Sequence, residues 1–167
     1  MKSVIESINQ NILPCTKCFH TRLDKGLGFG KGTNYVILEL TPTLLKESFT
    51  TAKENAADWY LWKCLRNVKW PIKETYFTSL IKCIGLPPDH TIASTCAKLW
   101  FSQELVAIAP RIIICLGEDT YDYLISLNLW YLGCGETDVV FVKSPLEIVN
   151  NSELYDEWKE SLKEILK

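Results

Sequence analysis

The segment PRIIICLGEDTYDYLISL, residues 110–127, constrains the fold of this chain more than any other. Its first half is a continuous apolar run that ends at Gly117, which is typical of a parallel strand covered on both faces. Its second half has helical spacing and begins with Glu118 and Asp119, acids that the helix dipole favours in a first turn. A buried strand that leads directly into a helix predicts an α/β domain.

Three further segments have the composition of strands and alternate with helical segments. The strands are expected at residues 34–40, 74–83 and 138–145, and the helices at 6–13, 43–69, 91–108, 117–127 and 150–167, the last capped by Asn151 or Ser152. We therefore expect one domain over residues 1–167, a three-layer α/β/α fold with a short four-stranded, mainly parallel sheet. Ligands of such sheets bind outside the carboxyl ends of the strands, here in the loops after Leu40, Ile81, Gly117 and Lys143.

Composition and charge narrow the class of protein. No apolar run approaches the ~20 residues of a membrane span, and MKSVIESINQ lacks the apolar core of a signal peptide, so we expect a soluble cytoplasmic protein without a membrane partner. The net charge is −2, but the charges are unevenly distributed along the chain. Residues 1–100 carry 13 Lys/Arg and 8 Asp/Glu, whereas residues 101–167 carry 5 Lys/Arg and 12 Asp/Glu. A basic half can follow phosphates, but a pI near 5.7 suggests that a partner assists any contact with DNA.

Four of the seven cysteines have the arrangement of metal ligands. Cys15 and Cys18 form a C-x2-C pair in a loop, Cys83 ends the second expected strand, and Cys96 follows inside the next helix. In a reducing compartment such cysteines favour a metal over disulfides, and four thiolates complete an iron–sulfur cluster or a tetrahedral zinc site. On spacing alone, Cys83 and Cys96 could also be ordinary buried thiols. The remaining three are expected in the core: Cys64, Cys115 and Cys134.

Two long segments resemble the iron–sulfur uracil-DNA glycosylases, the family 4 and 5 branch of the uracil-DNA glycosylase superfamily. They are CTKCFHTRLDKGLGFGKGTNYVIL and SLIKCIGLPPDHTIASTCAKLWFSQELVAIAPRIIICLGEDTYDYLI, and the resemblance runs from about residue 12 to 165. It implies the glycosylase fold with a structural 4Fe–4S cluster on Cys15, Cys18, Cys83 and Cys96; zinc is the alternative.

The catalytic positions that the resemblance implies have changed in this chain. The family's first strand ends in G-E-A-P-G, and alignment on Pro42 places Leu40 where the acid stands, with Glu39 one residue early. A shift of one residue in a strand turns a side chain to the opposite face, so we expect Glu39 to point away from the site unless the loop rearranges. Ser79 replaces the family's base-reading Asn, and Ser144 replaces the His of H-P-S. Since one preorganised hydrogen bond contributes ~3–4 kcal/mol, we predict no catalytic residue and a lost uracil excision.

Several side chains could contact DNA or a partner. The aromatic segment with Trp59, Tyr60, Trp62 and Trp70 favours a core helix with a basic outer face, and a base-stacking or partner surface is the alternative. His20 and His90 are expected to be surface or packing residues. The basic candidates for contact are Arg22, Lys25, Lys31, Lys63, Arg66 and Lys69.

The resemblance and the charge pattern together predict an iron–sulfur accessory subunit of DNA replication that has lost its chemistry. Such a subunit binds DNA, single-stranded or primer–template, and/or a DNA polymerase or primase. Fifteen lysines against three arginines are typical of an AT-rich genome, such as that of a low-GC bacterium or its mobile elements, phages included. The alternatives are a DNA glycosylase with altered base specificity that uses Glu39, and a protein that binds modified bases or DNA without cleaving them.

Overall fold

The computed structural model describes residues 2–18, 23–43, 56–129 and 137–167. Five strands form one sheet in the order β1-β3-β2-β4-β5. The strands are β1 (Phe29–Gly30), β2 (Tyr35–Glu39), β3 (Thr75–Ser79), β4 (Ile112–Leu116) and β5 (Asp138–Val142). The four expected strands are present and parallel, with Ile37 beside Phe77 on one side and Ile114 on the other.

The expected strand number of four was wrong, because a two-residue strand extends the sheet. β1 pairs antiparallel with β3, and the ring of Phe29 stacks on Phe77 with 4.9 Å between centroids. Gly30 has a φ of +105°, and a Cβ there would lie 2.4 Å from the Thr75 carbonyl oxygen, so this edge requires glycine.

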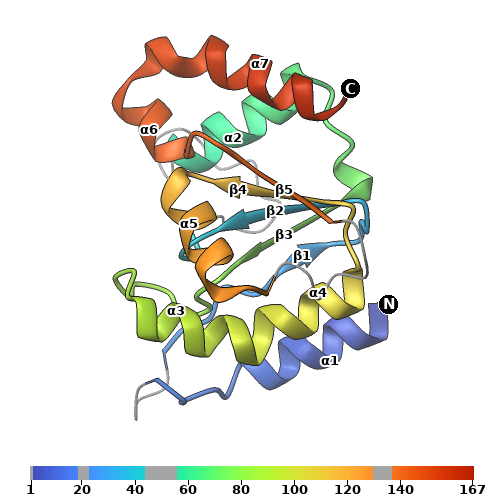
Figure 1. Ribbon diagram of the computed structural model, residues 1–167, viewed down its shortest axis with the longest axis vertical. Coiled ribbons are helices and arrows are strands. Elements are labelled where there is room, and N and C mark those ends of the chain that lie inside the picture. The colour runs from blue at the N-terminus through green and yellow to red at the C-terminus, as the bar shows by residue number, and fades with distance from the viewer. Residues whose placement is uncertain (1, 19–22, 44–55, 130–136) are drawn as a thin grey trace.

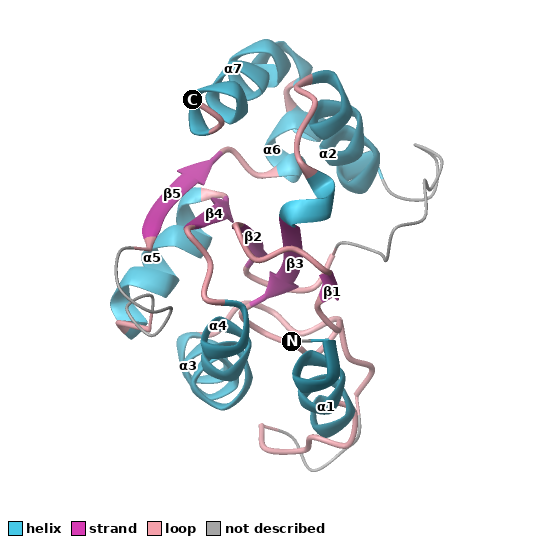
Figure 2. Ribbon diagram, turned by 90° about the vertical axis from the view of Figure 1, so that its right-hand side faces the viewer, coloured by secondary structure: helices cyan, strands magenta, loops and turns pink. Residues whose placement is uncertain are grey.

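Helices cover both faces of the sheet (Figures 1 and 2). On one face, Leu61, Ile148 and Trp158 pack against Ile37 and Ile114, bringing α2, α6 and α7 onto the sheet. The other face carries α4 and α5 with the π-helical segment η2, packed on Val36, Ile113 and Cys115, and α1 lies beside α4. The helices are α1 (Lys2–Ile12), α2 (Ala56–Asn67), α3 (His90–Cys96), η2 (Ala97–Phe101), α4 (Ser102–Ile108), α5 (Glu118–Leu127), α6 (Pro145–Asn150) and α7 (Tyr155–Ile165), with short 3₁₀ turns η1 (Ile72–Glu74) and η4 (Ser152–Leu154). The three-layer α/β/α expectation is confirmed.

Two expected helices differ in detail. The helix expected at 91–108 forms three consecutive segments, because the π turn η2 interrupts it, and Asp89 caps its start by accepting from the N–H groups of Thr91 and Ile92. The C-terminal helix is preceded by α6, which the sequence reading missed, and Asn151 caps η4. Of the helix expected at 43–69, residues 44–55 lie outside the described residues. No helix of the described part is long and apolar enough to cross a membrane.

Candidate functional site

A cleft of about 700 Å³ lies at the carboxyl ends of β2, β4 and β5. Its walls come from the loops after β2 and β3 and from the starts of α5 and α6, so all four loops where function was expected contribute, together with the start of α2. The lining residues are Glu39, Leu40, Thr41, Thr43, Ala57, Pro88, Leu116, Gly117, Glu118, Asp119, Thr120, Ser144, Pro145, Leu146 and Glu147.

Glu39, the last residue of β2, and Leu40 both border this cleft. Strand alternation continues up to this point: Leu40 packs with Val36 and Leu38 on one face of the sheet, whereas Glu39 also lines a smaller cavity with Phe29 and Phe77 on the other. The carboxylate is only 8% exposed: Oε1 accepts from the Thr43 N–H at 3.0 Å, and Oε2 accepts from the Thr43 hydroxyl at 2.6 Å. Its oxygens are thus engaged by the loop that follows the strand.

The two serines at the expected catalytic positions are also engaged. Ser79 is 2% exposed and its hydroxyl donates to the Ile81 carbonyl at 2.8 Å; it does not line the cleft. Ser144 is the N-cap of α6, where its hydroxyl accepts from the Glu147 N–H and Glu147 Oε2 accepts from the Ser144 N–H at 2.6 Å. This capping box holds the loop after β5 in one conformation.

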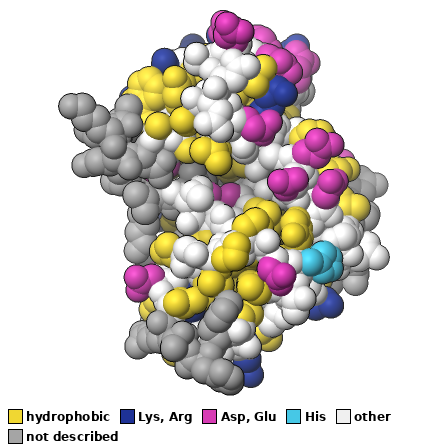
Figure 3. Space-filling model, turned by 90° about the vertical axis from the view of Figure 1, so that its left-hand side faces the viewer, with side chains coloured by type: hydrophobic (Ala, Val, Ile, Leu, Met, Phe, Trp, Pro, Cys, Tyr) yellow, Lys and Arg dark blue, Asp and Glu magenta, His cyan; other side chains and the backbone are white. Residues whose placement is uncertain are grey.

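The described lining of the cleft is acidic. It carries Glu39, Glu118, Asp119 and Glu147 and no Lys or Arg. Figure 3, which views this side of the molecule, shows acidic and apolar side chains in the middle of the face and basic ones towards its margins. Glu118 and Asp119 occupy the first turn of α5, so acids of the chain itself already meet the positive end of that helix dipole. A phosphate would meet repulsion there.

A second, smaller cavity is lined by all four cysteines of the expected metal site. Cys15 and Cys18 are half-buried in the N-terminal loop, Cys83 follows β3, and Cys96 ends α3. Four apolar side chains, one threonine and three lysines complete the wall: Ile12, Leu23, Leu99, Trp100, Thr16, Lys17, Lys25 and Lys82. Lys25 Nζ lies 3.2 Å from Cys83 Sγ, and the Lys82 N–H donates to Cys96 Sγ at 3.2 Å.

Burial and the neighbouring thiols affect the ionisation of Cys18 and Cys96. Burial raises the pKa of Cys18, and Cys83 and Cys15 raise it further, whereas Lys25 opposes them. Burial raises the pKa of Cys96 to about 11 against the opposing Lys82 N–H, and Cys83 and Cys18 act in the same sense as burial. Thiolates at Cys18 and Cys96 are therefore unfavourable in this cavity unless a cation is bound with them.

Thiolates of this kind suit zinc or an iron–sulfur cluster, and N–H groups directed at two of the sulfurs suit ligand thiolates. Within the described ranges, no three Cys, His, Asp or Glu side chains are grouped closely enough to hold a single metal ion.

Among the described residues, the other cysteines and the histidine line neither cavity. Cys64 and Cys115 are fully buried in the two cores, as expected. His90 is exposed at the start of α3, 5.7 Å from the Tyr123 ring. Cys134 and His20 lie outside the described residues.

The expected contact residues do not gather at the cleft. Lys25 belongs to the cysteine cavity, and Lys63 lies over the Trp59 ring at 4.6 Å and the Tyr155 ring at 5.1 Å. Lys31, Arg66 and Lys69 are exposed, after β1 and at or beyond the end of α2, towards the amino ends of the parallel strands. Trp62 and Trp70 are buried, consistent with the core reading of the aromatic segment. Arg22 lies outside the described residues.

A buried network of hydrogen-bonded side chains, which the sequence analysis did not predict, connects β3 to α4. Its members are Lys82, Glu104, Thr78 and Tyr76. The available signal was a lysine directly before Cys83 and one acid in an otherwise apolar helix face.

The fold and the cleft define an α/β/α protein whose ligand site lies at the carboxyl edge of a parallel sheet. The chain belongs to the uracil-DNA glycosylase superfamily, whose family model matches residues 42–167. The crystal structure of wild-type SMUG2 from Pedobacter heparinus superposes with a TM-score of 0.56 at 14% sequence identity, over 80% of this chain and 76% of that one. This likeness shows the fold alone. None of the curated proteins compared with the chain matches it.

Proposed function

We propose that this protein is a glycosylase-fold accessory subunit of DNA replication, with a four-cysteine iron–sulfur cofactor and without base excision. It acts in the cytoplasm of the host of a mobile element or phage, where it binds DNA, single-stranded or primer–template, and a DNA polymerase or primase. Superfamily membership supports a function related to DNA glycosylases.

This proposal depends on one observation: the side chains at the expected catalytic positions are either apolar or hydrogen-bonded to the protein's own backbone. Base excision needs a side chain that orients water or stabilises the sugar cation, and donors aimed at the leaving base. Here Leu40 offers no polar atom, Ser79 donates to a backbone carbonyl, and Ser144 serves a helix cap. The cleft thus lies where a glycosylase site is expected, but the side chains at these three positions are not available to orient water or to contact a leaving base.

The cofactor proposal depends on the cysteine cavity. A tetrahedral zinc with Zn–S bonds of about 2.3 Å holds its sulfurs roughly 3.8 Å apart. In a 4Fe–4S cluster each thiolate binds a different iron, so the sulfurs stand further apart. The four cysteines line one cavity, and we propose the cluster as their ligand, with zinc as the alternative.

In this cavity the chain's own residues would hold the cluster and balance its charge. Cys15, Cys18, Cys83 and Cys96 would be the ligands, and the cluster would join the N-terminal loop to β3 and α3. Lys25 Nζ offsets the charge at Cys83 Sγ, and the Lys82 N–H stabilises Cys96 as a thiolate.

The distribution of charge supports a partner. The acidic cleft disfavours phosphates, whereas the exposed Lys31, Arg66 and Lys69 lie elsewhere. If DNA phosphates bind the basic side chains at the amino ends of the strands, the acidic face around the cleft stays accessible to a protein partner.

A glycosylase with altered specificity is the second candidate, and one observation favours it. Glu39, a carboxylate, borders the cleft.

Incubation with oligonucleotides that carry uracil, hypoxanthine or another damaged base separates the two candidates. We expect no abasic product from the wild type. An abasic product that is lost in Glu39→Ala but kept in Glu147→Ala would establish the second candidate. Tighter binding to modified than to plain DNA, without a product, would instead identify a reader of modified bases.

Affinity capture from the native host tests the partner. We expect a polymerase or primase to co-purify and primer synthesis to change when the protein is added. DNA retention should weaken in the double variant Arg66→Glu/Lys69→Glu and persist in Lys163→Glu, whose exposed side chain pairs with Glu160 on α7. A clean monomer that affects neither primer synthesis nor DNA retention would contradict the proposal.

A further inference from the structure

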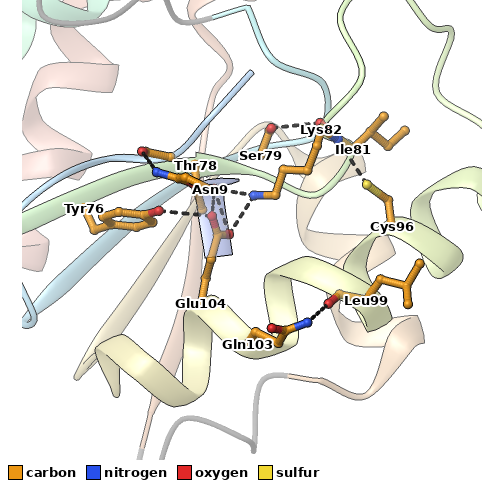
Figure 4. A network of polar contacts seen from close by, with 11 residues as sticks. Asn9, Tyr76, Thr78, Ser79, Ile81, Lys82, Cys96, Leu99, Gln103 and Glu104 are labelled. Atoms are coloured by element: carbon orange, nitrogen blue, oxygen red, sulfur yellow. Dashed lines mark hydrogen bonds and ion pairs between the residues drawn. The ribbon is translucent and has the colours of Figure 1, made fainter. Parts of the chain in front are cut away.

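A buried ion pair joins the end of β3 to α4. Lys82 Nζ lies 2.6 Å from Glu104 Oε2, and the two side chains are 1% and 0% exposed (Figure 4). A pair buried this deeply has a high desolvation cost, so removing one partner alone leaves a buried charge without its counter-ion.

Two hydroxyls of β3 complete the pair. The Tyr76 hydroxyl donates to Glu104 Oε1 at 3.0 Å, and the Thr78 hydroxyl donates to Oε2 at 2.9 Å. Lys82 Nζ also donates to the Thr78 oxygen at 2.5 Å. Burial and the Glu104 carboxylate raise the pKa of Tyr76, so its hydroxyl stays a donor. Each side chain of the network fixes the orientation of its neighbours. The network can therefore form in only one position of α4 along β3.

The same network is adjacent to two of the four cysteines. Lys82 directly precedes Cys83, and the Lys82 N–H donates to Cys96 Sγ at 3.2 Å. Cys96 and Glu104 belong to one continuous run of helix, α3–η2–α4. Figure 4 shows both side chains directed at the β3 segment that carries Lys82.

The π turn η2 makes this arrangement possible. Eight residues of α-helix turn through about 800°, which would leave Glu104 roughly 80° out of phase with Cys96. A π turn takes in about one extra residue, or ~100°, and brings the two side chains to within roughly 20° of each other. One helix face therefore presents a sulfur and a carboxylate to the same strand end.

We propose that Lys82 and Glu104 are positioning residues for the cysteine cavity. The pair fixes the Lys82–Cys83 peptide and the helix that carries Cys96, so that these two sulfurs are held where the cofactor needs them. This inference rests on the cofactor proposed above. It does not depend on the loss of base excision.

Three variants and one control test it: Lys82→Met, Glu104→Gln, the double variant Lys82→Met/Glu104→Gln, and Leu162→Ala. The double variant is neutral and keeps an acceptor for Tyr76. Leu162 is fully buried on the opposite face of the sheet, so its truncation destabilises the fold without touching the cavity. The readouts are iron and sulfide per chain, the rate at which a ferrous chelator removes iron well below the unfolding temperature, and the unfolding temperature itself.

We expect iron removal to become about 10–100-fold faster in both single variants, which is the usual effect of losing an outer partner of a metal ligand. The double variant should recover much of the unfolding temperature and still lose iron faster than the wild type. Leu162→Ala should unfold earlier and lose iron at the wild-type rate. Iron removal that follows the unfolding temperature across all four variants would overturn the inference.

A metal-free measurement separates this inference from the cofactor proposal. Alkylation of each thiol, resolved by mass spectrometry on iron-free protein, should be faster at Cys96 and Cys83 in Glu104→Gln than in the wild type, with Cys115 unchanged. If the wild type carries no iron or sulfide, the cofactor proposal fails and this arm alone decides the positioning role. Unchanged Cys96 and Cys83 rates would refute that role. If Glu104→Gln does not fold, the double variant takes its place.

Discussion

Glu104→Gln should be among the most destabilising single changes in the metal-free protein. The Lys82–Glu104 pair has a 2.6 Å contact and is at most 1% exposed, so the variant leaves a buried ammonium without its counter-ion. Breaking such a pair typically costs about 3–5 kcal/mol, out of a total stability of about 5–15 kcal/mol.

Urea unfolding followed by circular dichroism measures this cost. With an m-value of about 2 kcal/mol/M, the midpoint should fall by roughly 1.5–2.5 M. The neutral double variant Lys82→Met/Glu104→Gln should return to within about 1 kcal/mol of the wild type, because it buries no lone charge.

An exposed ion pair provides the matched control. Lys163 Nζ lies 2.7 Å from Glu160 Oε1, but the side chains are 42% and 58% exposed. Glu160→Gln should cost about 0–1 kcal/mol, since water screens both charges. If Glu104→Gln shifts the midpoint no more than Glu160→Gln does, the buried pair does not hold β3 to α4 and the reasoning is wrong.

Three further predictions address the cofactor, the pH dependence and the sheet edge. Purified protein should be brown with visible iron–sulfur absorption that Cys83→Ser abolishes and Cys115→Ala keeps, and removal of the metal should lower the unfolding temperature. Burial raises the pKa of Cys64 from 9.0 to about 11, so the thiol is protonated in both states below pH 9, and above it the unfolded chain ionises first. The advantage of the wild type over Cys64→Ala in urea unfolding should therefore shrink by about 2–3 kcal/mol between pH 9 and 11, and a constant difference would contradict this. Gly32→Ala should lower the unfolding temperature sharply because its Cβ would lie 1.7 Å from the Glu74 carbonyl carbon, whereas Gly85→Ala, in open space, should cost only backbone strain; equal effects would count against the edge geometry.

The sequence predicted the parts of the fold that depend on local pattern. The buried strands were visible as apolar runs, and Gly117 followed by two acids marked the start of α5. These features need no knowledge of distant contacts. The position of Cys83 and Cys96 beside Cys15 and Cys18 came from the family resemblance, because spacing alone left Cys83 and Cys96 open as ordinary buried thiols.

The missed elements were of two kinds. The start of α6 was visible in the sequence, because Ser144 and Glu147 have capping-box spacing with Pro145 at the first helical position. β1 was not visible, because two residues carry no periodicity and the strand depends on Phe29 stacking on Phe77. The π turn η2 was not predicted for a similar reason. It changes which residues share a helix face but does not change the amino-acid composition of the segment.

Strand alternation correctly placed Glu39 and Leu40 on opposite faces of β2. It did not predict that both residues border the cleft, because the cleft lies at the end of the strand, where residues of both faces reach it. The hydrogen bonds from the N–H and hydroxyl of Thr43 to Glu39 depend on the loop that follows and not on the period of the strand. Ligand sites of parallel sheets are built at such strand ends.

Backbone contacts at the end of β3 link the cleft to the cysteine cavity. The N–H of Leu80 donates to the Glu39 carbonyl and that of Ile81 to the Leu40 carbonyl, both at 2.9 Å, and the next N–H, of Lys82, donates to Cys96 Sγ. Because these donors are consecutive, a shift at the cysteines moves the peptide that supports the cleft loop. A cofactor in the cavity would thus stabilise the surface around the cleft whether or not bases are excised there. If this surface holds a partner, as proposed above, binding of that partner depends on the four cysteines even without base excision.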